Sequence, residues 1–136
     1  HHQEIKARLQ SQLPPIDQAL AALLTDLERR GRLEKTLVVL ATEFGRTVRI
    51  NPDGGRDHWP RAFSVVLAGG GVKAGHVFGK TDPYGSEPTD DPVHPEDLAA
   101  TIYSQLGIDP AKRLMSPGNR PVDIVRHGKV VRSLLA

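Results

Sequence analysis

The sequence contains no cysteine. Disulfide frameworks, thiolate metal sites and cysteine nucleophiles are therefore excluded. Aromatic residues make up only 4% of the chain and do not alternate with arginine or lysine, and the formal net charge is only +2. No long block of like charges occurs either. A nucleic-acid-binding domain normally shows a basic stripe or patch, so we expect no nucleic-acid partner.

Long apolar segments are also missing. No apolar run reaches the roughly 18 residues that a membrane-spanning helix needs, and no signal peptide is visible. We therefore predict no membrane span. The chain begins with HHQEIK, and we interpret His1 and His2 either as the remnant of a tag or as residues of a longer protein. From the length of 136 residues we expect a single domain or a fragment of one.

The hydrophobic pattern predicts two helices. Residues 15–30 carry leucines at helical spacing, which favours packing of this face in a core. The two prolines at 14 and 15 suit a helix entry, so residues 4–13 should form a separate turn or a kinked extension. Residues 94–108 should form the second helix, because Pro95 suits its first position and Gly107 its end.

Two continuous apolar runs, at residues 36–42 and 62–69, indicate strands that are buried on both faces, as in a parallel sheet. Residues 121–135 indicate a hairpin around His127 and Gly128. The expected fold class is α/β, with a parallel-rich sheet flanked by helices and a C-terminal β-hairpin at its edge. A truncated sheet would leave open edges, so we expect self-association through exposed sheet edges.

Candidate functional residues lie in the long loop between the two predicted strands. Glu43 follows the first strand directly, and Asp57 and His58 come late in the loop. Ligands of open α/β sheets bind beyond the carboxyl ends of the strands. Imidazole and carboxylate groups suit zinc or another transition ion, whereas carboxylates alone suit magnesium or calcium. The alternative is structural: Glu43 as a salt-bridge or helix-cap partner, and His58 as a hydrogen-bonded loop histidine.

Several stretches together resemble one bacterial family. They occur in the order TEFGRT, GGRDHWP, VVLAGGGVKAG, GKTD and HPEDLAATIYSQLGID. This combination is similar to the C-terminal portion of the domain of unknown function 1501 family, which in turn resembles the alkaline phosphatase and sulfatase superfamily. The resemblance runs from about residue 13 to the C-terminus. It implies an alkaline phosphatase-like fold and an exported, periplasmic protein.

The resemblance also implies metal ligands. The superfamily places an aspartate-histidine pair after a core strand, and Glu43 and Phe44 stand in that place here. Glu43 can replace the aspartate, but Phe44 cannot be a ligand. His58 matches a later histidine that binds the other metal, with Asp57 as a further ligand or as the group that orients His58. His1 or His2, with His2 as the candidate ligand, would be the end of an upstream histidine-containing ligand stretch.

The implied activity is metal-dependent hydrolysis of a phosphate or sulfate ester. Zinc is the expected divalent ion, with magnesium, calcium and manganese as alternatives, and Arg46 or Arg56 would bind the anionic substrate. The superfamily's nucleophile lies outside the matched portion, so these residues alone should be inactive. The alternative, favoured by Phe44, is a degenerate non-catalytic sulfatase-like domain that acts in binding or scaffolding. A third interpretation, a carbohydrate-binding module, depends only on Trp59.

Overall fold

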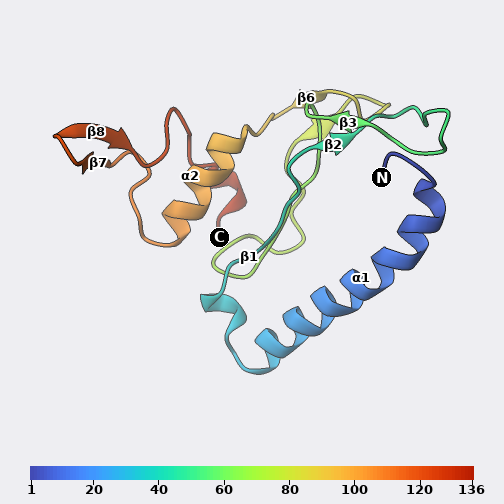
Figure 1. The fold of residues 1–136 in the computed structure, drawn as a ribbon. Helices are drawn as coiled ribbons and strands as arrows, with labels where there is room; N and C mark the ends of the chain where they lie inside the picture. The colour runs from blue at the N-terminus through green and yellow to red at the C-terminus, as the bar shows by residue number, and fades with distance from the viewer.

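The computed structural model describes residues 1–136 and contains two α-helices and four separate two-stranded antiparallel sheets (Figure 1). The helices are α1, Ile5–Arg29, and α2, Pro95–Gln105. The strands are β1 Val38–Leu40, β2 Gly45–Arg46, β3 His58–Trp59, β4 Val66–Ala68, β5 Lys80–Thr81, β6 Pro88–Asp90, β7 Arg113–Ser116 and β8 Arg120–Asp123. Two short 3₁₀ helices, η1 Leu33–Lys35 and η2 Arg132–Leu134, complete the chain.

The expected parallel-rich, alkaline phosphatase-like sheet is wrong. The two apolar runs do form strands, but β1 and β4 pair antiparallel, with Val38 opposite Ala68 and Leu40 opposite Val66. Parallel pairing needs a crossover connection, usually a helix, whereas the chain between these strands folds back without one. No further strand or helix covers the pair, so Leu40 and Val66 are exposed rather than buried on both faces.

Helix α1 is longer than predicted and lies along one side of the molecule (Figure 1). It begins at Ile5 and continues through Pro14 and Pro15, which therefore lie inside the helix rather than at its entry. The fixed φ of proline suits a helix, although each proline removes a backbone donor. The core role expected for the leucine stripe is wrong, because no residue of α1 is buried. No helix is both long and apolar enough to cross a membrane, as predicted.

The C-terminal hairpin lies earlier than predicted. Strands β7 and β8 pair from Arg113 opposite Asp123 to Ser116 opposite Arg120. The turn between them uses left-handed backbone at Gly118 and Asn119, with φ of 85° and 58°. Both residue types tolerate this conformation. Residues 121–135 therefore supply only one strand, and most of this segment runs back along α2.

Polar contacts hold that segment against α2. The predicted position of this helix is confirmed. The Thr101 hydroxyl donates to the Asp97 carbonyl at 2.7 Å and accepts from the Val131 amide at 2.9 Å. The Asp97 carboxylate accepts from the Lys129 amide at 2.7 Å and from the His94 amide at 3.1 Å. One helix turn therefore anchors the C-terminal segment through two side chains.

Very little of the chain is buried. Only 3 of the 136 residues are buried, namely Gly55, Ala100 and Thr101. Ala100 and Thr101 belong to the α2 anchor, whereas Gly55 lies in the loop between β2 and β3. Local polar contacts and close backbone packing, rather than a large apolar core, therefore position the residues of this fold.

Candidate functional site

Strands β2 and β3 bring the two motifs of the long loop together. Gly45 pairs with Trp59, and Arg46 pairs with His58. Only a glycine fits at position 45, because a Cβ atom there would lie 2.0 Å from the Ala62 carbonyl oxygen. The ladder continues beyond the strands, since the Thr47 amide donates to the Asp57 carbonyl at 3.0 Å. The predicted residues at positions 46, 57 and 58 therefore share one short ladder.

The N-terminal segment packs against the same loop (Figure 1). Gln3 forms an antiparallel bridge with Gly54, and the Arg56 amide donates to the His1 carbonyl at 3.0 Å. Gly55 permits this approach, because a Cβ atom there would lie 2.1 Å from the carbonyl of His2. These contacts place His2 beside residues that follow it by more than fifty positions.

Three side chains meet at this junction. His2 Nδ1 lies 3.0 Å from Asp57 Oδ1, and His2 Nε2 lies 3.0 Å from His58 Nε2. An ionised carboxylate can only accept hydrogen bonds, so Nδ1 of His2 carries a proton, and in the neutral form of the ring Nε2 is the nitrogen with the lone pair. The carboxylate thus selects one tautomer of His2 and turns the unprotonated nitrogen toward His58.

An arginine and a phenyl ring flank the histidine pair. Arg46 Nη1 lies 3.5 Å from His2 Nε2 and donates to the Arg56 carbonyl at 3.2 Å. The Phe44 ring lies against the His58 ring, with centroids 4.0 Å apart, and the Arg46 guanidinium is 5.5 Å from the Phe44 centroid. The pair is therefore bounded by a fixed positive charge on one side and by an apolar ring on another.

These neighbours shift two pKa values. Hydrogen bonds from His2 and then from Asn51 hold the pKa of Asp57 below its ordinary 3.8. Partial loss of hydration, followed by the charges of Arg46 and His2, lowers the pKa of His58 below 6.5, although the residue remains exposed. Asp57 is therefore ionised and His58 neutral at pH 7. A neutral imidazole and an oriented carboxylate are the forms that a metal site requires.

The structure brings together four of the predicted site residues: His2, Arg46, Asp57 and His58. Glu43 is exposed and does not join them in a metal-binding group. The contribution of Arg56 to the cluster is its carbonyl rather than its guanidinium. Asp57 orients His2 instead of His58. Its carboxylate lies beside Nδ1 of His2, whereas Nε2 of the same ring faces His58.

The donor set fits part of a metal site. No three His, Asp or Glu side chains are arranged to hold a metal ion together. The two facing Nε2 atoms could nevertheless supply two nitrogen ligands to an ion such as zinc. The Asp57 contact to the other nitrogen of His2 resembles the carboxylate–histidine arrangement that supports many zinc ligands. A complete site would need further ligands besides these two histidines.

Two contributors to the site were not predicted. The Thr47 hydroxyl accepts from the Asp57 amide at 3.1 Å, and the Asn51 amide group donates to the Asp57 carboxylate at 3.1 Å. The NPDGG stretch that contains Asn51 was the available signal, because asparagine followed by proline, aspartate and glycine is typical of a turn built on a side-chain hydrogen bond. Sequence alone does not show which carboxylate such an asparagine reaches.

Trp59, the basis of the carbohydrate-binding interpretation, anchors a loop. Its ring is half-buried, and its indole nitrogen donates to the Ser86 carbonyl at 2.7 Å. Arg61 lies over the same ring, with its guanidinium carbon 5.6 Å from the centroid. A tryptophan with these contacts has a packing role, so nothing at this position favours carbohydrate binding.

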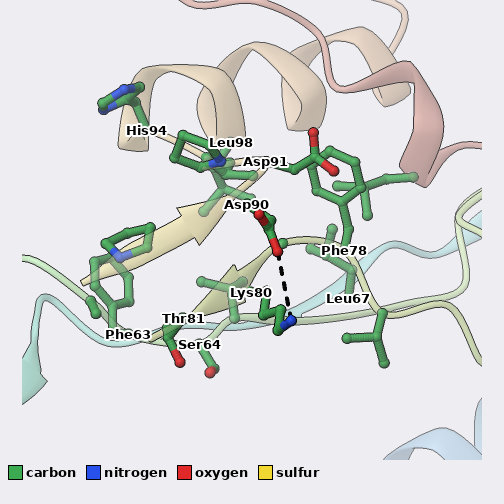
Figure 2. A pocket seen from close by; sticks show the side chains of 18 of the residues that line it. Phe63, Ser64, Leu67, Phe78, Lys80, Thr81, Asp90, Asp91, His94 and Leu98 are labelled. Carbon is green, nitrogen blue, oxygen red and sulfur yellow. Dashed lines mark ion pairs between the residues drawn. The ribbon is translucent and has the colours of Figure 1, made fainter. Parts of the chain in front are cut away.

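A separate hollow of about 640 Å³ lies between β4, the β5–β6 hairpin and the start of α2 (Figure 2). Its wall is mainly apolar, with Phe63, Phe78 and Leu98 among the lining side chains. Lys80 and Asp90 form an ion pair of 3.8 Å within it, as the dashed line in Figure 2 shows. None of the histidine-pair residues lines this hollow.

The sequence matches the model of a family described as "Protein of unknown function (DUF1501)" over residues 1–135. His1 and His2 lie inside the matched region. No curated protein and no solved structure matches the chain.

Proposed function

The chain belongs to the DUF1501 family, and we propose that its His2–His58 pair contributes to a divalent-metal centre that hydrolyses phosphate or sulfate esters. One observation carries this proposal: the Nε2 atoms of His2 and His58 face each other at 3.0 Å, and the Asp57 carboxylate lies 3.0 Å from the other ring nitrogen of His2. The resemblance of the motifs to the alkaline phosphatase and sulfatase superfamily supplies the reaction class and an exported location. Both of these remain part of the proposal.

Each side chain has a distinct task in this proposal. His2 and His58 would hold the ion, which would neutralise charge on the ester and make bound water more acidic. Asp57 keeps the His2 Nε2 lone pair available and turned toward His58. Arg46, already beside His2 Nε2, would bind the non-bridging oxygens of the anionic group.

The reaction would break the ester bond at phosphorus or sulfur. Over the whole reaction the oxygen of one water molecule would end up on that atom, and the alcohol would leave with a proton. None of the four residues is a serine or threonine that could form a covalent intermediate, so we propose that these residues bind and orient while the attacking group comes from elsewhere. On this basis the 136 residues alone should not turn over substrate.

Phe44 and Glu43 favour a second candidate, a non-catalytic domain that acts in binding or scaffolding. The resemblance implies a metal-binding histidine at position 44, but Phe44 stands there and its ring packs on His58. Glu43 lies outside the cluster. In this alternative the His2–Asp57–His58 cluster only fastens the N-terminal segment to the loop.

Metal binding separates the two candidates. We would titrate the protein with Co²⁺, a spectroscopic substitute for Zn²⁺, and measure bound zinc by elemental analysis. His58→Ala and His2→Ala should abolish binding of about one equivalent of metal, while His76→Ala, a histidine outside the cluster, should not. Because no turnover is expected from these residues alone, binding of inorganic phosphate and sulfate to the metal-loaded protein would then be measured. Absence of metal in the unmodified protein would sink the hydrolase proposal and leave the binding alternative.

A further inference from the structure

The loop between β2 and β3 is built around the side chain of Asn51. Its Oδ1 accepts from the Asp53 amide at 3.1 Å and from the Gly55 amide at 2.9 Å. Its Nδ2 donates to Asp57 Oδ1 at 3.1 Å and to the His2 carbonyl at 3.0 Å. Both partners of Oδ1 are donors and both partners of Nδ2 are acceptors, so only this orientation of the amide satisfies them all.

The two ends of the amide do different things. The Oδ1 end shapes the loop and sets Gly55 where the N-terminal backbone can approach it. The Nδ2 end binds the two parts of the junction at once, namely the His2 main chain and the carboxylate that bonds to the His2 ring. One side-chain amide therefore couples the shape of the loop to the position of the Asp57–His2 hydrogen bond.

We propose that Asn51 is a positioning residue that holds the Asp57 carboxylate against His2 Nδ1 and thereby determines which nitrogen His2 presents to His58. The metal-binding consequence rests on the function proposed above, whereas the effect on the His2 tautomer does not. Without the Nδ2 donor, Asp57 would lose one of its two side-chain hydrogen bonds and the His2 backbone would lose a tether. His2 would then exchange between tautomers and ring orientations.

Asn51→Asp separates positioning from loop formation. The aspartate keeps an acceptor oxygen for the amides of Asp53 and Gly55, but it removes both donors and sets a second carboxylate against Asp57. The matched control is Asn119→Asp. Asn119 is the other asparagine of the chain, lies in the β7–β8 turn and makes none of the contacts of this site.

The first readout is the ¹⁵N NMR signature of the His2 ring in metal-free protein. The unmodified protein and Asn119→Asp should show His2 protonated at Nδ1, and Asn51→Asp should lose this signature. The second readout is Co²⁺ affinity, which should fall about 10- to 100-fold in Asn51→Asp, as is typical when a group that orients a metal ligand is lost. The same tautomer and the same Co²⁺ affinity in Asn51→Asp would overturn the proposal.

A double substitution guards against a general loss of structure. Asn51 acts both on Asp57 and on the His2 backbone, so Asn51→Asp should weaken Co²⁺ binding by a smaller factor in the Asp57→Ala background than in the unmodified protein. Additive losses would mean that Asn51 acts independently of Asp57, which contradicts the proposal. If the unmodified protein binds no Co²⁺ while its His2 signature still depends on Asn51, the proposed function fails and the positioning role stands.

Discussion

At the residue scale, one carboxylate and one glycine control the candidate site. Asp57 accepts from the His2 ring and from the Asn51 amide, so it connects an N-terminal residue to the loop. Gly55 leaves room for the backbone of His2, which no residue with a Cβ atom could do. The chemistry of the His2–His58 pair therefore depends on two positions that do not hold the ion in the proposed site.

Acidification should disrupt the contact between His2 and His58. The pKa of His58 is lowered in the folded protein, first by lost hydration and then by Arg46. Protonation thus favours the unfolded chain, so the contribution of His58 to stability is present above about pH 6.5 and is lost as the pH falls below it. NMR titration should place the His58 midpoint below 6.5, and Arg46→Gln should raise it. An unchanged midpoint in Arg46→Gln would contradict this account.

Gly55→Ala should expel the N-terminal segment from the loop. The added methyl group would lie 2.1 Å from the His2 carbonyl, and overpacking of this kind typically costs about 1–3 kcal/mol. The loss of the His2–His58 contact would be measured by NMR and the stability by urea unfolding. In a chain lacking residues 1–3 the same substitution should cost little. An equal cost in both chains would mean that the clash is not the cause.

At the scale of elements, short ladders and helix ends hold the parts of the molecule together. The β2–β3 ladder pairs residues 45–46 with residues 58–59, and the single turn of α2 that contains Asp97 and Thr101 anchors the C-terminal segment. Thr101 is 1% exposed, so its hydroxyl satisfies the Val131 amide in a place that water does not reach. Loss of such a partner is more costly than loss of an exposed hydrogen bond.

Thr101→Val should therefore loosen the C-terminal segment. Valine has nearly the shape of threonine but leaves the Val131 amide without its acceptor, at a cost of about 1–3 kcal/mol. Urea unfolding would measure the change in stability, and hydrogen exchange at Val131 would locate it. Thr89→Val, which removes an exposed hydroxyl contact of 3.4 Å, is the control. Equal effects of the two substitutions would argue against a special role for Thr101.

At the scale of the whole molecule, the main feature is apolar surface. Only 3 of the 136 residues are buried, and the two-stranded β1–β4 sheet has an open edge on each side. Two-stranded sheets are marginal in water unless something packs against them, and open edges invite pairing with another strand. The self-association expected from the sequence thus remains a prediction, and the exposed β1–β4 pair is where it should occur.

Lysine on β1 or β4 should reduce that association. Val39 and Val66 are exposed on these strands, so Val39→Lys and Val66→Lys would place charge beside the open edges. Sedimentation at increasing protein concentration should show a shift toward monomer in both variants. Val77→Lys, at a residue that is 87% exposed and outside the strands, should have no such effect. A monomeric unmodified protein that binds no apolar dye would refute the prediction.

Local signals in the sequence were sufficient for some elements. Pro95 and Gly107 bracket α2 as expected, because a helix entry and a left-handed end depend only on neighbouring residues. The five ordered stretches from TEFGRT to HPEDLAATIYSQLGID were enough to predict the family, although the match begins at residue 1 rather than near residue 13. Local signals did not predict the extent of α1, because the two prolines that suggested a boundary lie within the helix.

The pairing of distant segments was decided only in the tertiary structure. An apolar run predicts a strand, but its partner and direction depend on how the intervening chain returns, and here β1 and β4 meet antiparallel. The site follows the same logic. His58 and Asp57 were identifiable from their residue types, whereas the contact with His2 and the role of Asn51 arise from hydrogen bonds between segments some fifty residues apart. Sequence by itself determined which groups were available, and long-range contacts decided which of them meet, because the closeness of two distant segments is not encoded by either one alone.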